Sequence, residues 1–170
     1  MSRTAVVVGN PKRGSRTLAA ATALTRRLTD AEPDLVVDLA GLGPALLDWQ
    51  DPAVASLVDD VGAADLVVVA SPTYKASYTG LLKLFLDRFA GGTGLRGLAV
   101  PLMLGAAPRH ALAGEVHLRP LLAELGAAVP TPALFVLDHE HDRAEAYDAW
   151  LTRSRPLVSA FLASTTGAPA

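Results

Sequence analysis

The chain has 170 residues, of which 51% are hydrophobic, and this is enough apolar material for one domain with a full core. Its formal net charge of −2 gives no general attraction to nucleic acid or to an anionic membrane, and the absence of cysteine excludes disulfides, thiolate catalysis and cysteine-ligated iron–sulfur clusters. No apolar run approaches the roughly 20 residues of a membrane span, and the short N-terminal run lacks a cleavage site, so we expect a cytoplasmic protein.

Apolar runs of strand length alternate with helical patterns along the chain. The segments predicted to be buried strands are Thr4–Val8, Leu35–Leu39, Asp65–Ala70, Leu98–Leu104 and Ala133–Leu137. The segments predicted to be helices are Arg16–Leu28, Pro52–Gly62, Thr79–Phe89, Glu115–Leu125 and Asp142–Leu162. Ser15 is expected to cap the first helix, Pro156 is a candidate kink in the last, and residues 40–50 are expected to form a loop.

This repeated strand–helix alternation predicts an α/β fold, a doubly wound five-stranded parallel sheet in three α/β/α layers. Of the two common layouts, the strand order 2-1-3-4-5 suits five strands better, and it brings together the turns that follow strands one, three and four. With no repeat, linker or low-complexity segment, residues 1–163 are expected to form a single domain. Residues 164–170 are expected to form a flexible tail.

The turn between the first strand and the first helix, Gly9–Thr17, is rich in groups that bind phosphate. The free N–H groups and partial positive charge of a helix N-terminus favour an anion, the hydroxyls of Ser15 and Thr17 add donors, and Arg16 adds a charge. A Walker A motif is excluded because Ser15-Arg16 stands where Lys-Ser/Thr is required, and the dinucleotide fingerprint is absent. The alternative is that Ser15 only caps the helix and that the cations of the turn are ordinary surface charge.

The turn Pro72–Tyr78 follows the third predicted strand and suits a flat aromatic ligand. Pro72 fixes the backbone, Tyr74 offers a planar face and a hydroxyl, and Lys75 offers a charge. The alternative is a turn whose tyrosines pack under the edge of the sheet.

The helix behind this turn carries an apolar stripe. Its members are Tyr78, Leu81, Leu82, Phe85, Leu86 and Phe89. Their spacing favours packing on the sheet or contact with a second subunit, and the sequence leaves both alternatives open.

A third turn, Gly105-Ala-Ala-Pro-Arg-His110, follows the fourth strand and leads to Leu118-Arg-Pro120. Together with Gly-x-Pro-x-x-x-Ser-Arg-Thr at 9–17 and Ser-Pro-x-Tyr-Lys-Ala-Ser-Tyr-Thr-Gly-Leu-Leu-Lys at 71–83, it resembles the NADPH-dependent FMN reductases, which have a flavodoxin-like fold. The resemblance covers roughly residues 4–137. It is strongest to the small reductases of two-component systems, which supply reduced FMN to an alkanesulfonate-type monooxygenase.

The resemblance implies that the chain is an NAD(P)H:FMN oxidoreductase, with NADPH or NADH as the donor of a hydride to FMN and with a homodimeric or homotetrameric assembly. It implies no catalytic protein side chain, because the flavin carries the chemistry. No metal site is expected. Ser15, Arg16 and Thr17 are expected to hold the FMN phosphate, and Gly105 and Ala106 are expected to approach the pyrimidine end of the ring. The residues expected to bind FMN are Asn10, Ser15, Arg16, Thr17, Pro72, Thr73, Tyr74, Lys75, Gly105 and Ala106.

The chain departs from the family pattern in two turns. The third turn has Leu104–Ala107 where many relatives have Thr-Gly-Gly-Thr, and the second has Lys75-Ala76 where azo- and quinone-reductase relatives usually have Asn-Gly. The second departure favours the flavin-reductase branch. The candidates for the 2′-phosphate of NADPH, each with plain surface charge as its alternative, are Lys12, Arg13 and Arg109.

The histidines give a weaker signal. Asp138-His-Glu-His-Asp142 has the residue types of a metal site, but a solvated polar loop after the fifth strand is the favoured interpretation. His110 is expected to shape the third turn, and His117 has no evident partner.

Other functions remain open at this point. The same flavin site suits a quinone, azo dye or metal oxyanion as acceptor, and a flavodoxin-like electron carrier is a further alternative, although such carriers tend to be strongly acidic. A partner module that binds no flavin is disfavoured by the intact first and second turns. The sequence leaves open whether FMN is a prosthetic group or a substrate that leaves, and whether NADPH or NADH is used.

Overall fold

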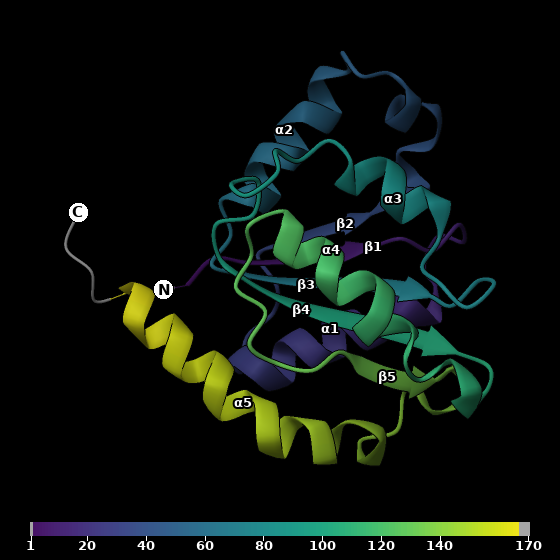
Figure 1. Ribbon diagram of the computed structural model, residues 1–170, viewed down its shortest axis with the longest axis vertical. Helices are drawn as coiled ribbons and strands as arrows, with labels where there is room; N and C mark the ends of the chain where they lie inside the picture. The colour runs from purple at the N-terminus through teal and green to yellow at the C-terminus, as the bar shows by residue number, and fades with distance from the viewer. Residues whose placement is uncertain (1, 167–170) are drawn as a thin grey trace.

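The computed structural model describes residues 2–166, which form a parallel sheet with helices on both faces (Figure 1). The strands are β1 (Thr4–Val8), β2 (Leu35–Asp38), β3 (Leu66–Pro72), β4 (Leu98–Gly105) and β5 (Leu134–Leu137). Their order in the sheet is β2-β1-β3-β4-β5, and every pairing is parallel. The predicted fold class and strand order are therefore confirmed.

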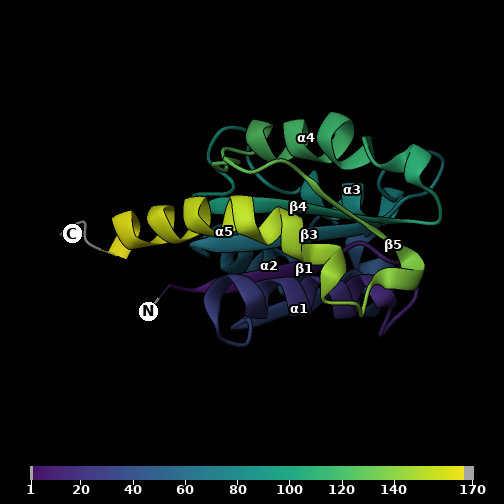
Figure 2. The same ribbon diagram turned by 90° about the horizontal axis from the view of Figure 1, so that it is seen from below.

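The α-helices cover the sheet in two layers. Their bounds are α1 (Arg16–Thr29), α2 (Pro52–Gly62), α3 (Gly80–Leu86), α4 (Arg119–Glu124) and α5 (Glu145–Thr166). Buried side chains of α1 and α5 pack on one face, and those of α2, α3 and α4 pack on the other. Figure 2 shows the sheet between α1 on one side and α3 and α4 on the other.

The central strands are buried on both faces because successive side chains point to opposite layers. In β1, Val6 and Val8 face α1 and α5, whereas Ala5 and Val7 face α2 and α3. The pairing aligns Val8 with Ala70, so β1 ends beside Ala70 and β3 continues to Pro72. An apolar sequence without alternation is thus the expected signature of these strands.

The segment expected to be one regular helix over 115–125 is built differently. It forms a π-helix, Gly114–Leu118, followed by the short α4, and the Arg119 N–H donates to the Gly114 carbonyl. Pro120 lacks an N–H and so cannot donate to residue 116, which weakens the regular ladder at this point. The wider turn is one way in which a helix accommodates such an interruption.

Other element boundaries also differ from the prediction. Two 3₁₀ turns, Leu39–Gly41 and Gly43–Leu47, occupy much of the expected loop over 40–50. Helix α5 starts at Glu145 rather than Asp142, contains Pro156 without ending there, and continues to Thr166. It therefore includes the first residues of the expected tail, and residues 167–170 of that tail lie outside the described residues.

The apolar stripe of α3 packs on the sheet. Leu82, Phe85, Leu86 and Phe89 are buried in the core on this face, and the rings of Phe85 and Phe89 meet edge to face at 5.3 Å. Burial in the core thus accounts for the stripe, and Leu84 is the residue of α3 that presents a large apolar side chain to the surface.

Hydrogen bonds fix the turns at the carboxyl ends of β1, β3 and β4. The Gly9 N–H donates to the Ala70 carbonyl at 2.8 Å, and the Thr73 N–H donates to the Leu104 carbonyl at 2.6 Å. The buried Thr79 hydroxyl caps α3 by accepting from the Leu82 N–H and donates to the Gly9 carbonyl at 2.5 Å. A β-carbon on Gly9 would lie 2.4 Å from that of Leu82, so this junction has no spare space.

We predict that Thr79→Ala destabilises the protein by about 2 kcal/mol, because it removes a helix cap and leaves a buried carbonyl without its donor. Urea unfolding followed by circular dichroism measures the change. Thr152→Ala, on the exposed surface of α5, is the matched control and is expected to change the unfolding free energy by less than about 0.5 kcal/mol. Equal midpoints for the two variants would contradict the structural role given to Thr79.

Candidate functional site

The turns after β1, β3 and β4 meet at one edge of the sheet, on the right-hand side of Figure 1. This edge lies opposite the start of β1 and the end of α5. In a doubly wound sheet with this strand order, ligands bind at the carboxyl edge near the point where the order reverses, here between β1 and β3. The residues predicted to bind FMN all belong to these turns or to the strand and helix ends that flank them.

The first turn, residues 9–17, shapes the N-terminus of α1. The Ser15 hydroxyl accepts from the Leu18 N–H at 3.2 Å, which confirms the predicted cap. Asn10 holds the turn internally: its side-chain amide donates to the Thr17 hydroxyl at 3.0 Å, and its carbonyl oxygen accepts from the Lys12 N–H at 2.9 Å. Ser15 and Thr17 are buried, whereas Arg16 is exposed.

The backbone of this turn offers donors that the described residues do not use. The N–H groups of Arg16 and Thr17 lie at the first helical positions and donate no hydrogen bond to any acceptor within residues 2–166. They carry the partial positive charge of the helix N-terminus, next to the exposed Arg16 guanidinium. This combination suits a phosphate group.

The first turn is also tied to the end of β2. The Gly14 N–H donates to Asp38 Oδ2 at 3.1 Å, and Gly14 adopts φ 59°, a conformation that favours glycine. Arg13 donates to the carbonyls of Ala40 and Gly41. The contact of Asp38 with the first turn was not predicted from the sequence. The only indication there is an acidic residue at the last position of a short strand.

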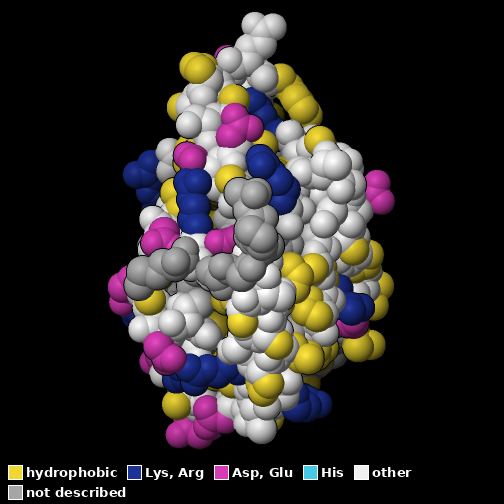
Figure 3. Space-filling model, turned by 90° about the vertical axis from the view of Figure 1, so that its left-hand side faces the viewer, with side chains coloured by type: hydrophobic (Ala, Val, Ile, Leu, Met, Phe, Trp, Pro, Cys, Tyr) yellow, Lys and Arg dark blue, Asp and Glu magenta, His cyan; other side chains and the backbone are white. Residues whose placement is uncertain are grey.

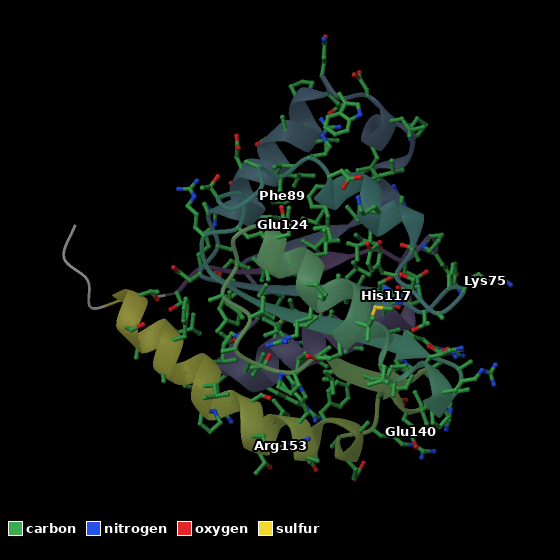
Figure 4. All side chains as sticks on the ribbon, viewed as in Figure 1. Lys75, Phe89, His117, Glu124, Glu140 and Arg153 are labelled. Carbon is green, nitrogen blue, oxygen red and sulfur yellow. The ribbon has the colours of Figure 1, made fainter. Side chains whose placement is uncertain are left out.

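The second turn is a tight reversal between Tyr74 and Ser77, whose backbones exchange hydrogen bonds of 2.8 and 3.2 Å. Lys75 and Ala76 adopt φ 52° and 66°, the left-handed conformations of a type I′ turn, which Asn-Gly adopts with less strain. Non-glycine residues cost roughly 1–2 kcal/mol each in this conformation. The reversal leaves Tyr74 54% exposed and places Lys75 at the tip of the turn (Figure 4).

Thr73 and Gly105 lie side by side where β3 and β4 end. The Thr73 hydroxyl is buried and has no hydrogen-bond partner within the described residues. A β-carbon on Gly105 would lie 2.8 Å from the Phe135 ring and 3.3 Å from the Thr73 hydroxyl, so neighbouring side chains already require glycine here. Pro72 is buried at the end of β3, and Ala106 is exposed directly after Gly105.

Unpaired positive charges gather at this edge. Within residues 2–166, the basic side chains without a hydrogen-bond or ion-pair partner are Lys12, Arg16, Lys75 and Arg109 at this edge, and Arg96 at the opposite edge. The opposite edge carries interspersed acidic and basic side chains (Figure 3), among them the pairs Arg3–Asp60 and Arg155–Asp30. Of the candidates for the NADPH 2′-phosphate, Arg13 donates to backbone carbonyls, whereas Lys12 and Arg109 have no side-chain partner within the described residues.

The histidines are placed around the same edge without forming a metal cluster. In the segment after β5, His141 Nδ1 lies 3.0 Å from the Asp138 carbonyl, and Glu140 pairs with Arg143. The part of the chain that the structure describes has no group of three or more His, Asp or Glu side chains placed to hold a metal ion. His110 has a buried Nδ1 without a partner there, and with His117 it lines a cavity of about 180 Å³ beside Ala76.

A larger cavity, of about 340 Å³, lies between the end of α1 and α5 at the opposite edge of the sheet, far from these turns. None of the helices described here is both long enough and apolar enough to cross a bilayer.

Residues 2–142 match the family model described as NADPH-dependent FMN reductase. The chain belongs to this family. It is 36% identical over 124 residues to an FMN reductase (NADPH) of Pseudomonas aeruginosa, covering 69% of this chain and 67% of that protein. It is also 35% identical over 172 residues to the NADH-dependent FMN reductase SfnF of Pseudomonas putida, covering 94% and 92% of the two chains.

A solved structure supports the same assignment. The apo form of the NADH:FMN oxidoreductase EMOB superposes with a TM-score of 0.84 at 28% identity, covering 99% of this chain and 92% of that one. The family resemblance and the predicted enzyme class, an NAD(P)H:FMN oxidoreductase that uses FMN and a reduced nicotinamide cofactor, are confirmed. This family membership favours the reductase over the electron carrier and over the partner module without flavin.

The described residues fit FMN chemically. The first turn supplies free N–H donors and a cation for a phosphate, and the buried Thr73 hydroxyl supplies an unsatisfied polar atom beside the exposed ring of Tyr74. When bound, FMN supplies the hydride-accepting chemistry. The individual assignments of residues to FMN remain predictions.

We predict that Ala76→Gly stabilises the protein by about 0.5–1 kcal/mol, because relief of the left-handed strain exceeds the added entropy of the unfolded chain. The measurement is urea unfolding. Ala63→Gly is the matched control: Ala63 is exposed with φ −88°, so glycine brings no relief there and lowers stability. Destabilisation by both variants would show that Ala76 is not strained.

Proposed function

We propose that this reductase holds FMN between the first turn, residues 9–17, and the second turn, residues 72–78, and releases the reduced flavin to a partner monooxygenase. One observation carries the proposal: the free N–H groups of Arg16 and Thr17 lie beside a guanidinium that has no other partner in the described chain. In this proposal Ser15, Arg16 and Thr17 hold the phosphate, with Asn10 keeping the turn in shape.

The remaining assignments follow from position. Pro72 and Thr73 line one edge of the flavin ring, with the free Thr73 hydroxyl available as a donor, and Tyr74 and Lys75 border its exposed side. Gly105 and Ala106 lie toward the pyrimidine end. Because no protein nucleophile is needed, these residues act by binding and orienting the ring and by excluding water from one face.

Transfer of flavin to another enzyme is supported by the chemistry of the product. Reduced FMN formed by a reductase of this family has to be oxidised by an acceptor, and a monooxygenase is the acceptor that the sequence resemblance implies. A homodimer or homotetramer is also part of the proposal, supported by the exposed side chains of Leu47, Trp49 and Leu84 around α3. The cytoplasmic location expected from the sequence stays a prediction.

The first test is NADPH and NADH oxidation by the purified protein in air, with and without added FMN, after its visible spectrum has been recorded. We expect a colourless or weakly yellow protein whose turnover depends on added FMN. A yellow protein that stays inert toward both nucleotides would indicate an electron carrier. A colourless protein that oxidises neither NADPH nor NADH, even with added FMN, would contradict the proposal.

We predict that Arg16→Ala raises the FMN dissociation constant about tenfold, because it removes a charge-assisted contact with the phosphate. Riboflavin, which lacks the phosphate, is expected to bind the variant and the unmodified protein equally. Arg96→Ala removes an equally unpaired arginine from the opposite edge and serves as the control. Quenching of flavin fluorescence measures the dissociation constants of the unmodified protein and of both variants. An unchanged FMN dissociation constant for Arg16→Ala would refute the assignment of Arg16 to the phosphate.

A further inference from the structure

The carboxylate of Asp38 lies against the first turn. As the last residue of β2, it accepts a hydrogen bond from the Gly14 N–H to Oδ2 at 3.1 Å. Its other oxygen, Oδ1, is buried and has no hydrogen-bond partner within residues 2–166. The group is therefore only half satisfied, and it contacts the turn that leads directly to the N-terminus of α1.

No basic side chain of the described residues lies within ion-pair distance of Asp38. Arg13, which crosses to the segment after β2, donates to the carbonyls of Ala40 and Gly41 instead. Asp34, just before the same strand, is different: one of its oxygens accepts from both the N–H and the hydroxyl of Thr4, and these bonds lower its pKa. Asp38 thus has no ion-pair partner among the described residues.

A structural role alone does not account for this charge. The hydrogen bond to Gly14 needs only a neutral acceptor, which an asparagine side chain supplies in the same shape. A partly buried carboxylate without a paired cation is less stable in the folded protein than a neutral amide, because its loss of hydration is not offset by an ion pair. The charge itself therefore calls for another explanation, and the neighbouring phosphate site provides one.

We propose that Asp38 is a positioning residue that keeps the affinity for FMN low: it shapes the first turn through Gly14 while its charge opposes the flavin phosphate. The inference rests on the proposed placement of that phosphate at the N-terminus of α1. A phosphate monoester carries a charge of about −1.5 to −2 at pH 7, so a carboxylate that is hydrogen-bonded to the same turn weakens its binding through like-charge repulsion. Weak retention lets reduced FMN leave for its acceptor.

The test compares Asp38→Asn with the unmodified protein by quenching of flavin fluorescence. Asparagine keeps the acceptor for Gly14 and removes the charge. We expect the FMN dissociation constant to fall about tenfold at low salt, the difference to shrink as ionic strength rises, and the riboflavin dissociation constant to stay unchanged. Asp60→Asn makes the same charge change at the opposite edge and is expected to alter neither constant.

Asp38→Ala separates shape from charge. It removes the acceptor as well, so it is expected to bind FMN more weakly than Asp38→Asn. The inference is overturned if Asp38→Asn binds FMN no more tightly than the unmodified protein, if riboflavin gains affinity equally, or if Asp38→Asn fails to fold. Failure of the unmodified protein to bind or reduce FMN would instead refute the proposed function, so the two failures are distinguishable.

Discussion

The pairing of β1 with β3 determines where this protein does its chemistry. The two strands are aligned up to Val8 and Ala70, and the hydrogen bond from the Gly9 N–H to the Ala70 carbonyl continues the pairing directly after β1. Thr79 then joins the start of α3 to the same glycine. The first and second turns are thereby held at a common edge, and the groups of these two turns that are assigned to FMN depend on that junction.

Much of this arrangement could be predicted from local sequence. Continuous apolar runs identify strands buried on both faces, and Ser15 before an apolar-periodic segment identifies the start of α1. The number of strands favoured one of two common strand orders, and the structure has that order. The second turn was also evident, because Pro-x-Tyr after a buried strand is unusual in a simple connection.

What the sequence did not reveal depends on contacts between distant segments. Asp38 meets Gly14 because β2 pairs with β1, and nothing local to either residue indicates that contact. The left-handed conformations of Lys75 and Ala76 oppose their own preferences and are imposed by the reversal between Tyr74 and Ser77. The π-helix before α4 likewise overrides a pattern that indicates a regular helix.

Three unfavourable features of the structure share one location. The strained second turn, the unpartnered Thr73 hydroxyl and the half-satisfied Asp38 carboxylate all lie at the carboxyl edge, where each lowers stability or leaves polar groups unsatisfied. The buried strands and the helix layers on either side supply the stability that tolerates them. A protein that retained its flavin permanently would gain by neutralising Asp38, because a neutral acceptor gives the same turn with stronger binding of phosphate. The charge is consistent instead with a site whose ligand has to leave, and in such a site affinity is limited by the same residue that gives the turn its shape.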